Sequence, residues 1–471
     1  MSSEEKFMKP KILLFTYIYY PILSCYLLGQ ANAKTQDMEI KLVPAQNPII
    51  ENQMPINSVK SNQDNNGLFI EAEAEIFNKT AFSLNQRVPN NGYGYFLGML
   101  SIGYNYGNFS FVLGGVGAGL AYDSTKNNNN AEGLGFNYVG SYPGYLANRE
   151  ATNINTHNYL IHNAYIGYDN SIFKIKVGRF LQEDDDWYDS YAEGISVIYK
   201  FANKYHLKIF GSSTYALVGQ GWLNDFSRTY FTNGLLNAEF GYNYEELKAM
   251  IYIYYGINEF ISPGFNIEVG FGDSDNIYTT TKLTAIFPVH QKLAKERGFF
   301  VNILEPKGFN ASILLRQDVE FFEKYLAAIA FYKNIGNANA RMALFGNPIG
   351  IDIWDNSIYT EGASLNASVA PDAFSALLFT RARYENIATF LQQADIGINA
   401  RYTYSPSNDE YSLSLFCDLG ITKNLSLSLI LNYYTTIIKN ELLILDDSMR
   451  ANISRATFDR SYLISRITYS F

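Results

Sequence analysis

Two-residue alternation governs the last stretch of the sequence, Arg460-Ser461-Tyr462-Leu463-Ile464-Ser465-Arg466-Ile467-Thr468-Tyr469-Ser470-Phe471. Leu463, Ile467, Tyr469 and Phe471 fall on one face, and Arg466 falls on the other with the more polar residues. Because successive side chains of a strand point to opposite faces, this stretch predicts a strand with one lipid-facing side. A terminal aromatic residue on such a strand is the signal read by the barrel-assembly machinery. We therefore assign that role to Phe471, with Tyr469 and Ile467 beside it.

The other end of the sequence predicts export. Lys9 and Lys11 precede an apolar run over 12–28, and Ala31-Asn32-Ala33 has the form of a cleavage site. This pattern indicates a secretory signal peptide over 1–33, with Met8 as an alternative start. A membrane anchor is the less favoured alternative, because the apolar run is short for a span. Residues 34–66 are polar and contain prolines, so we expect a flexible periplasmic lead-in.

Composition narrows the class of protein. Charged residues make up 17% of the chain, against roughly 25% in an average soluble protein. Tyr 38 and Phe 33 are abundant, and the net charge of −9 argues against nucleic acid as a partner. Cys25 and Cys417 are too few for a disulfide scaffold or a thiolate zinc site. An exported chain without another long apolar run is either soluble or a membrane β-barrel.

The alternation of the final stretch recurs from Gly67 onward. Leu68, Ile70 and Ile76 share one face of a predicted strand, and Glu71, Glu73 and Glu75 share the other. Three glutamates on one face require water there. The same pattern predicts further strands over 95–106, 109–122, 159–168, 172–179, 192–201, 205–217, 234–244, 247–255, 374–384, 390–404, 411–422, 424–437 and 457–471. We predict an all-β fold, a transmembrane antiparallel β-barrel of about 16–18 strands over residues 67–471.

Connections of two lengths alternate between these strands. Tight turns are expected at Gly107, Asp169, Asn203, Glu245 and Lys423, and long polar segments over 123–158, 181–191, 218–233 and 439–456. Short periplasmic turns and long extracellular loops are the plan of an outer-membrane barrel. The region 288–358 is the least regular. A helical turn over 290–297 and a loop over 334–347 are expected there.

One block carries a family resemblance. Lys174-Ile175-Lys176-Val177-Gly178-Arg179-Phe180 is followed by Asp186-Trp187-Tyr188-Asp189-Ser190-Tyr191-Ala192-Glu193-Gly194-Ile195. The Gly-Arg … Trp … Tyr … Gly spacing resembles the Helicobacter outer-membrane (Hof-type) proteins and, more distantly, OprD-like specific porins. The resemblance implies an 18-stranded monomeric porin that passes small solutes. Two features depart from this resemblance. The adjoining run Glu183–Asp186 is acidic, and the row of basic residues typical of the family does not align with this sequence position by position.

Three other stretches could in principle bind a cation, bind a phosphate or catalyse proteolysis, but each has a simpler interpretation. The acidic residues Glu183–Asp186 and Asp189 predict a solvated loop, with a cation site, a constriction loop and a loop bridged to lipopolysaccharide as alternatives. The glycines of 114–119 lack the Lys-Ser/Thr ending of a phosphate loop and fit a bending strand. His157 near Asp123 is a weak candidate for a protease site. We therefore expect no catalytic residues, no metal site and no cofactor.

Charged residues on the faces opposite the apolar rows are expected to line the inside of the barrel. A lipid-facing charge would cost about 2–4 kcal/mol at the membrane midplane. The expected pore-lining residues are Glu71, Glu73, Glu75, Lys174, Lys176, Arg381, Arg383, Arg401, Arg460 and Arg466.

Two interpretations of these charges stay open. Pairing of the first and last strands would bring Arg460 and Arg466 beside the three glutamates and neutralise them. For Arg381, Arg383 and Arg401 we favour a basic track that guides solutes, because Glu385 is their only acidic neighbour on the predicted strands.

The sequence thus favours an outer-membrane porin, a water-filled channel for passive diffusion of small hydrophilic solutes. Its expected partners are membrane lipid, lipopolysaccharide, the assembly machinery and the solutes. The main alternative is a surface adhesin or structural barrel whose loops bind host surface ligands. A barrel enzyme is the least favoured.

Overall fold

The computed structural model describes residues 66–84, 92–124, 158–182, 186–219, 222–227, 233–290, 309–339, 348, 367–406, 408–439 and 457–470. All of them belong to one unit, Ala45–Phe471. The predicted signal peptide, residues 34–65 of the lead-in, Phe471 and most of the predicted long loops lie outside the described residues. No helix among the described residues is long and apolar enough to cross a membrane.

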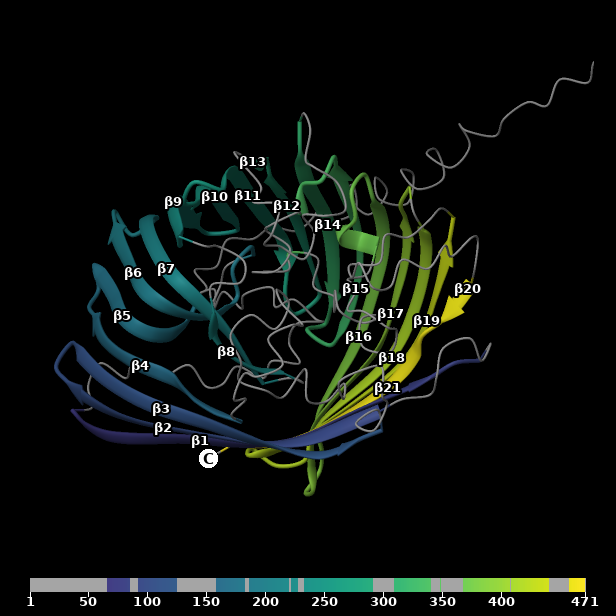
Figure 1. Cartoon of the computed structure of the whole chain (residues 1–471), viewed down its shortest axis with the longest axis horizontal. Coiled ribbons are helices and arrows are strands. Elements are labelled where there is room, and N and C mark those ends of the chain that lie inside the picture. The colour runs from purple at the N-terminus through teal and green to yellow at the C-terminus, as the bar shows by residue number, and fades with distance from the viewer. Residues whose placement is uncertain are drawn as a thin grey trace, which may run out of the picture. The chain divides into compact units, whose positions relative to one another are not determined.

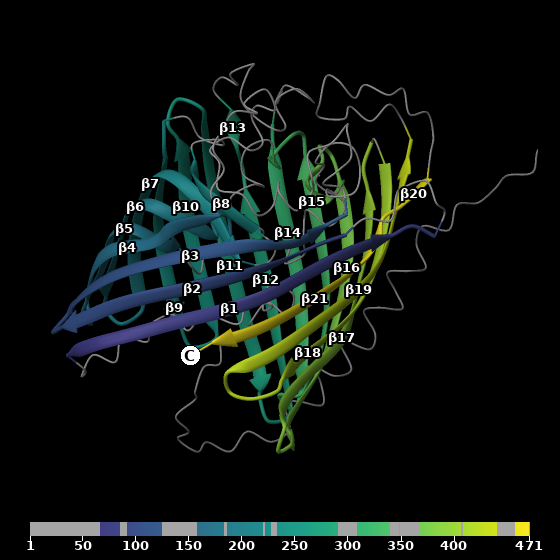
Figure 2. The ribbon, with the colours of Figure 1, turned by 60° about the horizontal axis from the view of Figure 1, so that its bottom comes forward.

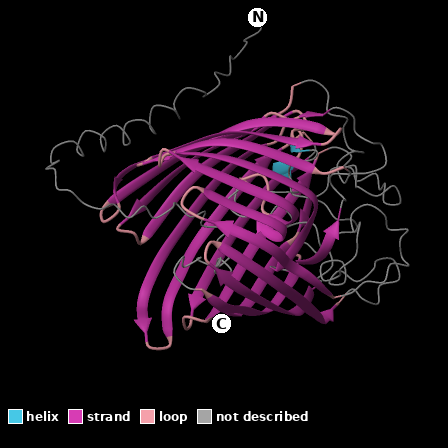
Figure 3. Cartoon of the chain, turned by 90° about the vertical axis from the view of Figure 1, so that its left-hand side faces the viewer, coloured by secondary structure: helices cyan, strands magenta, loops and turns pink. Residues whose placement is uncertain are grey.

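β-strands make up nearly all of the described chain (Figures 1 and 3). The first ten are β1 (Gly67–Phe82), β2 (Gly92–Tyr106), β3 (Phe109–Asp123), β4 (Tyr159–Asp169), β5 (Phe173–Gln182), β6 (Ser190–Phe201), β7 (Tyr205–Gly219), β8 (Trp222–Ser227), β9 (Leu235–Tyr244) and β10 (Leu247–Gly256). They are followed by β11 (Phe260–Asp273), β12 (Ile277–Ile286), β13 (Val289–His290), β14 (Ala311–Phe321), β15 (Tyr325–Ile335), the 3-10 turn η3 (Ala367–Val369), β16 (Phe374–Ala388), β17 (Leu391–Tyr404), β18 (Asn408–Gly420), β19 (Leu425–Ile438), β20 (Thr457–Asp459) and β21 (Ser461–Ser470).

Eighteen of the described strands form a closed antiparallel ring. Each strand of the ring pairs with the next one along the chain, and β21 closes it by pairing with β1, with Thr468 opposite Glu75. The remaining three, β8, β13 and β20, pair with β7, β11 and β19. Closure leaves no strand edge of the ring unpaired, as a spanning sheet requires. The prediction of an all-β transmembrane barrel is confirmed.

The two faces of the wall differ as the alternation predicts. On β1, Leu68 is 68% exposed on the outer face, whereas Glu75 on the inner face is 4% exposed. The same division runs round the ring, with exposed outer residues that include Leu100, Leu113, Ile251, Leu378, Leu413 and Leu463. An apolar outside and a polar inside are the pattern of a barrel that spans lipid and encloses water.

Tight turns gather at one end of the ring. In the turns 201–204 and 321–324 both central residues have positive φ, at Ala202, Asn203, Phe322 and Glu323. This is the turn geometry that matches the twist of paired strands. Next to the turn 201–204, the rings of five outer-face residues follow one another at 4.9–5.9 Å: Phe173, Tyr199, Phe201, Tyr205 and Phe240. They form an aromatic belt of the kind found where barrels meet the membrane surface.

Three connections differ from what the sequence predicts. Residues 218–233 contain strand β8 rather than only a polar loop, and Val289–His290 form β13 where a helical turn was expected to begin. Residues 291–297 lie outside the described residues. The connection 257–259 between β10 and β11 is short although it lies at the end opposite the tight turns.

In the region 288–358, where the sequence was least regular, the structure contains the ring strands β14 and β15.

Candidate functional site: the inner face and the segments folded into the barrel

The first strand places its three glutamates on the inner face. Glu75 accepts a hydrogen bond from the Tyr95 hydroxyl, and Ser470 of β21 donates one to Glu73 at 3.4 Å. Arg466 of β21 lies opposite Phe77 of β1, and its positive charge acts on the Glu73 carboxylate. The expectation that closure brings a basic residue to these glutamates therefore holds for Arg466.

Arg460 does not join this group. It precedes Ser461, which pairs with Phe82 at the far end of β1, while the glutamates pair near Ser470. Its guanidinium lies 5.7 Å from the ring centre of Phe458. The placement beside the glutamates was wrong because β20 and Arg460 prolong the last strand toward the loop end rather than the turn end.

Lys174 and Lys176 lie on β5 on the face opposite exposed Phe173 and Val177. The Lys176 ammonium lies 5.5 Å from the ring centre of Tyr165 and 5.8 Å from that of Phe180. Both rings face inward, so this part of the wall combines cations with aromatic surface. The role of these lysines along a solute path stays a prediction.

The arginines of the expected basic track are ion-paired. Arg381 binds Glu320 at 3.2 Å, Arg383 binds Asp395 at 2.8 Å, and Arg401 binds Glu410 at 2.9 Å. The argument that Glu385 is their only acidic neighbour was therefore wrong. Glu320 comes from β14, which the sequence did not predict, and Glu410 precedes the predicted strand 411–422. Asp395 lies on the predicted strand 390–404 and was overlooked. Guidance of solutes by these arginines stays a prediction.

Further ion pairs follow the inner wall. They are Lys248–Glu268 at 2.9 Å, Lys282–Asp186 at 2.6 Å and Arg316–Asp318 at 2.6 Å. Lys248 and Glu268 join the neighbouring strands β10 and β11, where opposite charges stabilise the pairing. Lys282 binds the β5–β6 connection, and Arg316 and Asp318 share strand β14. Among the described residues, no three His, Cys, Asp or Glu side chains gather as they would to hold a metal ion.

The connection between β5 and β6 folds into the barrel. Asp186 binds Lys282 of β12 and accepts a hydrogen bond from Asn266 of β11 at 2.6 Å. Trp187 donates its indole N–H to the Tyr252 hydroxyl at 2.6 Å. The sequence predicted a solvated acidic loop here, and for Asp186 that prediction was wrong, because its carboxylate is bound to the wall. Glu183, Asp184 and Asp185 lie outside the described residues.

Strand β8 forms a second inward segment. Leu223 is fully buried and packs in a cluster with inner-face residues of β1, β2, β3 and β4, among them Tyr95 and Leu160. The Phe226 ring lies 4.6 Å from the guanidinium of Arg179 on β5. Figure 1 accordingly draws β8 inside the ring of strands.

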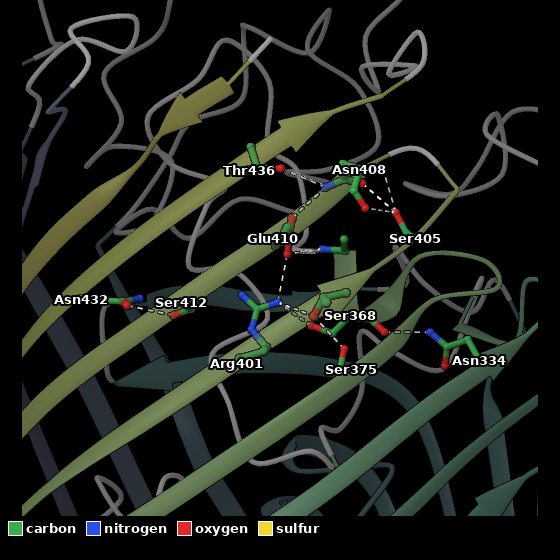
Figure 4. A network of polar contacts seen from close by, with 12 residues as sticks. Asn334, Ser368, Ser375, Arg401, Ser405, Asn408, Glu410, Ser412, Asn432 and Thr436 are labelled. Atoms are coloured by element: carbon green, nitrogen blue, oxygen red, sulfur yellow. Dashed lines mark hydrogen bonds and ion pairs between the residues drawn. The ribbon is translucent and has the colours of Figure 1, made fainter. Parts of the chain in front are cut away.

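The third inward segment is Ala367–Ala370, which contains η3 and precedes β16 (Figure 4). The backbone N–H of Ala367 donates to Glu410 at 2.9 Å, and Asn334 of β15 donates to the carbonyls of Ser368 and Ala370 at 2.7 and 2.9 Å. The segment is thus fixed to β15 on one side and to β18 on the other.

Two of these segments meet in one apolar cluster. Val369 belongs to the same buried cluster as Trp187 and Tyr188, together with the inner-face residues Tyr252, Tyr254 and Phe260. The 186–189 segment and the 367–370 segment are therefore both packed, through this cluster, against the inner face of the wall.

The sequence analysis assigned 181–191 and 218–233 to polar segments, with a constriction loop only as an alternative for Glu183–Asp186, and it assigned no structure to 367–370. One signal was available: Trp187, Tyr188, Leu223 and Val369 are large apolar residues in segments that would otherwise be solvated. Ile467 and Tyr469 are exposed on the outer face, while Phe471 lies outside the described residues. Their role as an assembly signal stays a prediction.

Comparison with known proteins adds a family and a fold. Residues 72–471 match a family model described as "Putative outer membrane protein". No curated protein matches the sequence. OccAB4 of Acinetobacter baumannii has a similar structure, with a TM-score of 0.60 and 10% identity, over 87% of this chain and 99% of that chain.

Two Pseudomonas aeruginosa structures are also similar. OccD3 (OpdP) gives a TM-score of 0.56 at 13% identity, over 87% of this chain and 94% of that chain. OpdK, crystallised with vanillate, gives a TM-score of 0.56 at 10% identity, over 85% of this chain and 99% of that chain. At these identities the likeness concerns the fold.

Proposed function

Because the chain belongs to the outer-membrane protein family whose model covers residues 72–471, we propose that it is a porin for small hydrophilic solutes. The family match confirms the resemblance on which the sequence analysis drew, and it places the chain in the outer membrane. Solutes would cross passively through the inside of the barrel, down their concentration gradients.

One observation carries the proposal: the closed ring of eighteen strands is apolar outside and charged inside. An anchor for surface loops needs only a small barrel whose interior is filled by side chains, whereas rings of 16–18 strands leave an aqueous channel. Ion-paired walls such as Arg383–Asp395 keep polar side chains facing a region that water can enter.

Solute uptake into liposomes tests the proposal. Purified, folded protein should let vesicles swell in isotonic solutions of small neutral sugars, and the rate should fall as the sugar grows larger. The size dependence follows from the inward segments that narrow the barrel. Heat-unfolded protein is the matched control and should give no swelling. Equal rates with folded and unfolded protein would refute a channel.

The adhesin alternative predicts a different result. A folded barrel that passes no sugar but retains cells on a host-derived surface would favour it over the porin. No contact among the described residues favours adhesion, because the long loops that would carry it lie outside them.

A further inference from the structure

Arg401 and Glu410 form a buried ion pair inside the barrel, at the point where the third inward segment meets the wall (Figure 4). The side chain of Arg401 is 4% exposed and that of Glu410 is 0% exposed. An ion pair this deeply buried gives up the hydration of both charges, which its mutual attraction seldom repays in stability. Its presence therefore needs another reason.

The contacts of Glu410 indicate that reason. One carboxylate oxygen accepts hydrogen bonds from the Arg401 guanidinium and from the backbone N–H of Ala367, both at 2.9 Å. The other oxygen accepts one from the Asn408 side chain at 3.0 Å. The carboxylate thus joins the wall directly to the first residue of the inward segment.

The contacts of Arg401 complete the arrangement. The same nitrogen that binds Glu410 also lies within hydrogen-bond distance of the Ser368 hydroxyl at 3.2 Å and of the Thr403 hydroxyl at 3.1 Å. Thr403 and Glu410 belong to the wall, and Ser368 belongs to the segment. With so little exposure, Arg401 is poorly placed to touch a passing solute, unlike Arg383, whose side chain is 24% exposed.

We propose that Arg401 and Glu410 are positioning residues of the channel, which hold the segment Ala367–Ala370 inside the barrel and thereby set the width of the solute path. The inference rests on the proposed porin function. It goes beyond that function by naming the contacts that hold the segment in place. These contacts are the Arg401–Glu410 pair with its hydrogen bonds to Ala367 and Ser368, and together they are called the latch. Because Val369 packs in the same cluster as Trp187, release of the latch would also loosen the 186–189 segment.

A thiol placed in the segment reports its position directly. Ala367 is 4% exposed, so Ala367→Cys in a chain with Cys25 and Cys417 replaced by Ser should react slowly with a charged maleimide. Adding Glu410→Ala should make the thiol react readily. Glu410→Gln retains an oxygen that can accept from the Ala367 N–H and should give an intermediate rate.

Ser412→Ala is the matched control. Ser412 lies on the same strand as Glu410 and donates one hydrogen bond to Asn432 at 2.9 Å, away from the segment. Its removal should leave the reaction rate of the thiol unchanged. Heat-modifiable migration in gels verifies that each variant is folded. If Glu410→Ala does not fold, the pair Arg401→Met with Glu410→Leu removes the latch without leaving a buried charge unpaired.

The conductance of the same variants tests the second half of the proposal. Without the added cysteine, Glu410→Ala should give larger single-channel steps than the native chain and should admit larger polymers, while Ser412→Ala should not. A thiol that stays protected in folded Glu410→Ala refutes the latch. A released thiol with native conductance refutes the role in the solute path. A native chain that conducts no ions overturns the porin function itself, whatever the thiol reports.

Discussion

At the scale of single residues, the pairing of charges decides how the inner wall affects ions. Arg383 and Asp395 face each other across β16 and β17, with two guanidinium nitrogens bonded to the carboxylate at 2.8–3.2 Å. Each charge neutralises the other, so the pair contributes little net field while it is intact. Removing one partner leaves the other as a fixed charge of the wall.

The prediction for this pair is a change of ion selectivity with opposite signs. Arg383→Ala should shift the reversal potential in a salt gradient toward cation preference, because Asp395 remains. Asp395→Ala should shift it toward anion preference, because Arg383 remains. The double variant should return close to the native value. Equal shifts of the same sign in both single variants would show that the pair does not face the conducting path.

At the scale of elements, Tyr252 fixes the 186–189 segment to the wall. Its hydroxyl receives the Trp187 indole N–H at 2.6 Å and lies 3.2 Å from the carbonyls of Phe265 and Ala285. Tyr252→Phe should remove the hydrogen bond from the indole N–H, at a cost of about 0.5–1.5 kcal/mol. We expect noisier single-channel currents with the barrel still folded. Native noise levels in Tyr252→Phe would contradict the anchoring role.

The close approach of strands gives a second prediction at this scale. A side chain at Gly397 would overlap the carbonyl oxygen of Thr380 and the Phe416 ring, whereas one at Gly119 would meet nothing within 4 Å. Gly397→Ala should therefore lower the stability of the folded barrel by about 1–3 kcal/mol, as overpacking does. Urea titration in detergent measures this. Gly119→Ala is the control, and an equal loss in both variants would contradict the packing argument.

Two-residue periodicity predicted fourteen of the eighteen ring strands, whereas β11, β12, β14 and β15 were not predicted. Alternation placed Leu463, Ile467 and Tyr469 outside and Tyr462 and Thr468 inside, and the structure agrees. The inward segments were not predictable, because Asp186 and Val369 find their partners on strands distant in sequence. Arg401 shows the same limit: its inward direction follows from alternation, but its partner Glu410 depends on the register of β17 against β18.

At the scale of the whole molecule, the ring has two unlike ends. Figure 2 shows the strands of the ring from another side. Because consecutive strands are antiparallel, the turns at Gly107, Asp169, Asn203, Glu245 and Lys423 share one end, and we propose that this end faces the periplasm. In a chain with Cys417 replaced by Ser, a cysteine at Asn424 should resist a membrane-impermeant reagent on intact cells. A cysteine at Asn128, in the predicted long loop, should react. The reverse pattern would invert the topology.

The central claim is that the ring encloses a path open to ions and small solutes. Single-channel recording of the purified, folded chain in a planar lipid bilayer tests it most directly. The account predicts discrete, lasting conductance steps that disappear when the protein is heat-unfolded before addition. A folded, heat-modifiable barrel that inserts into the bilayer and gives no steps would contradict it.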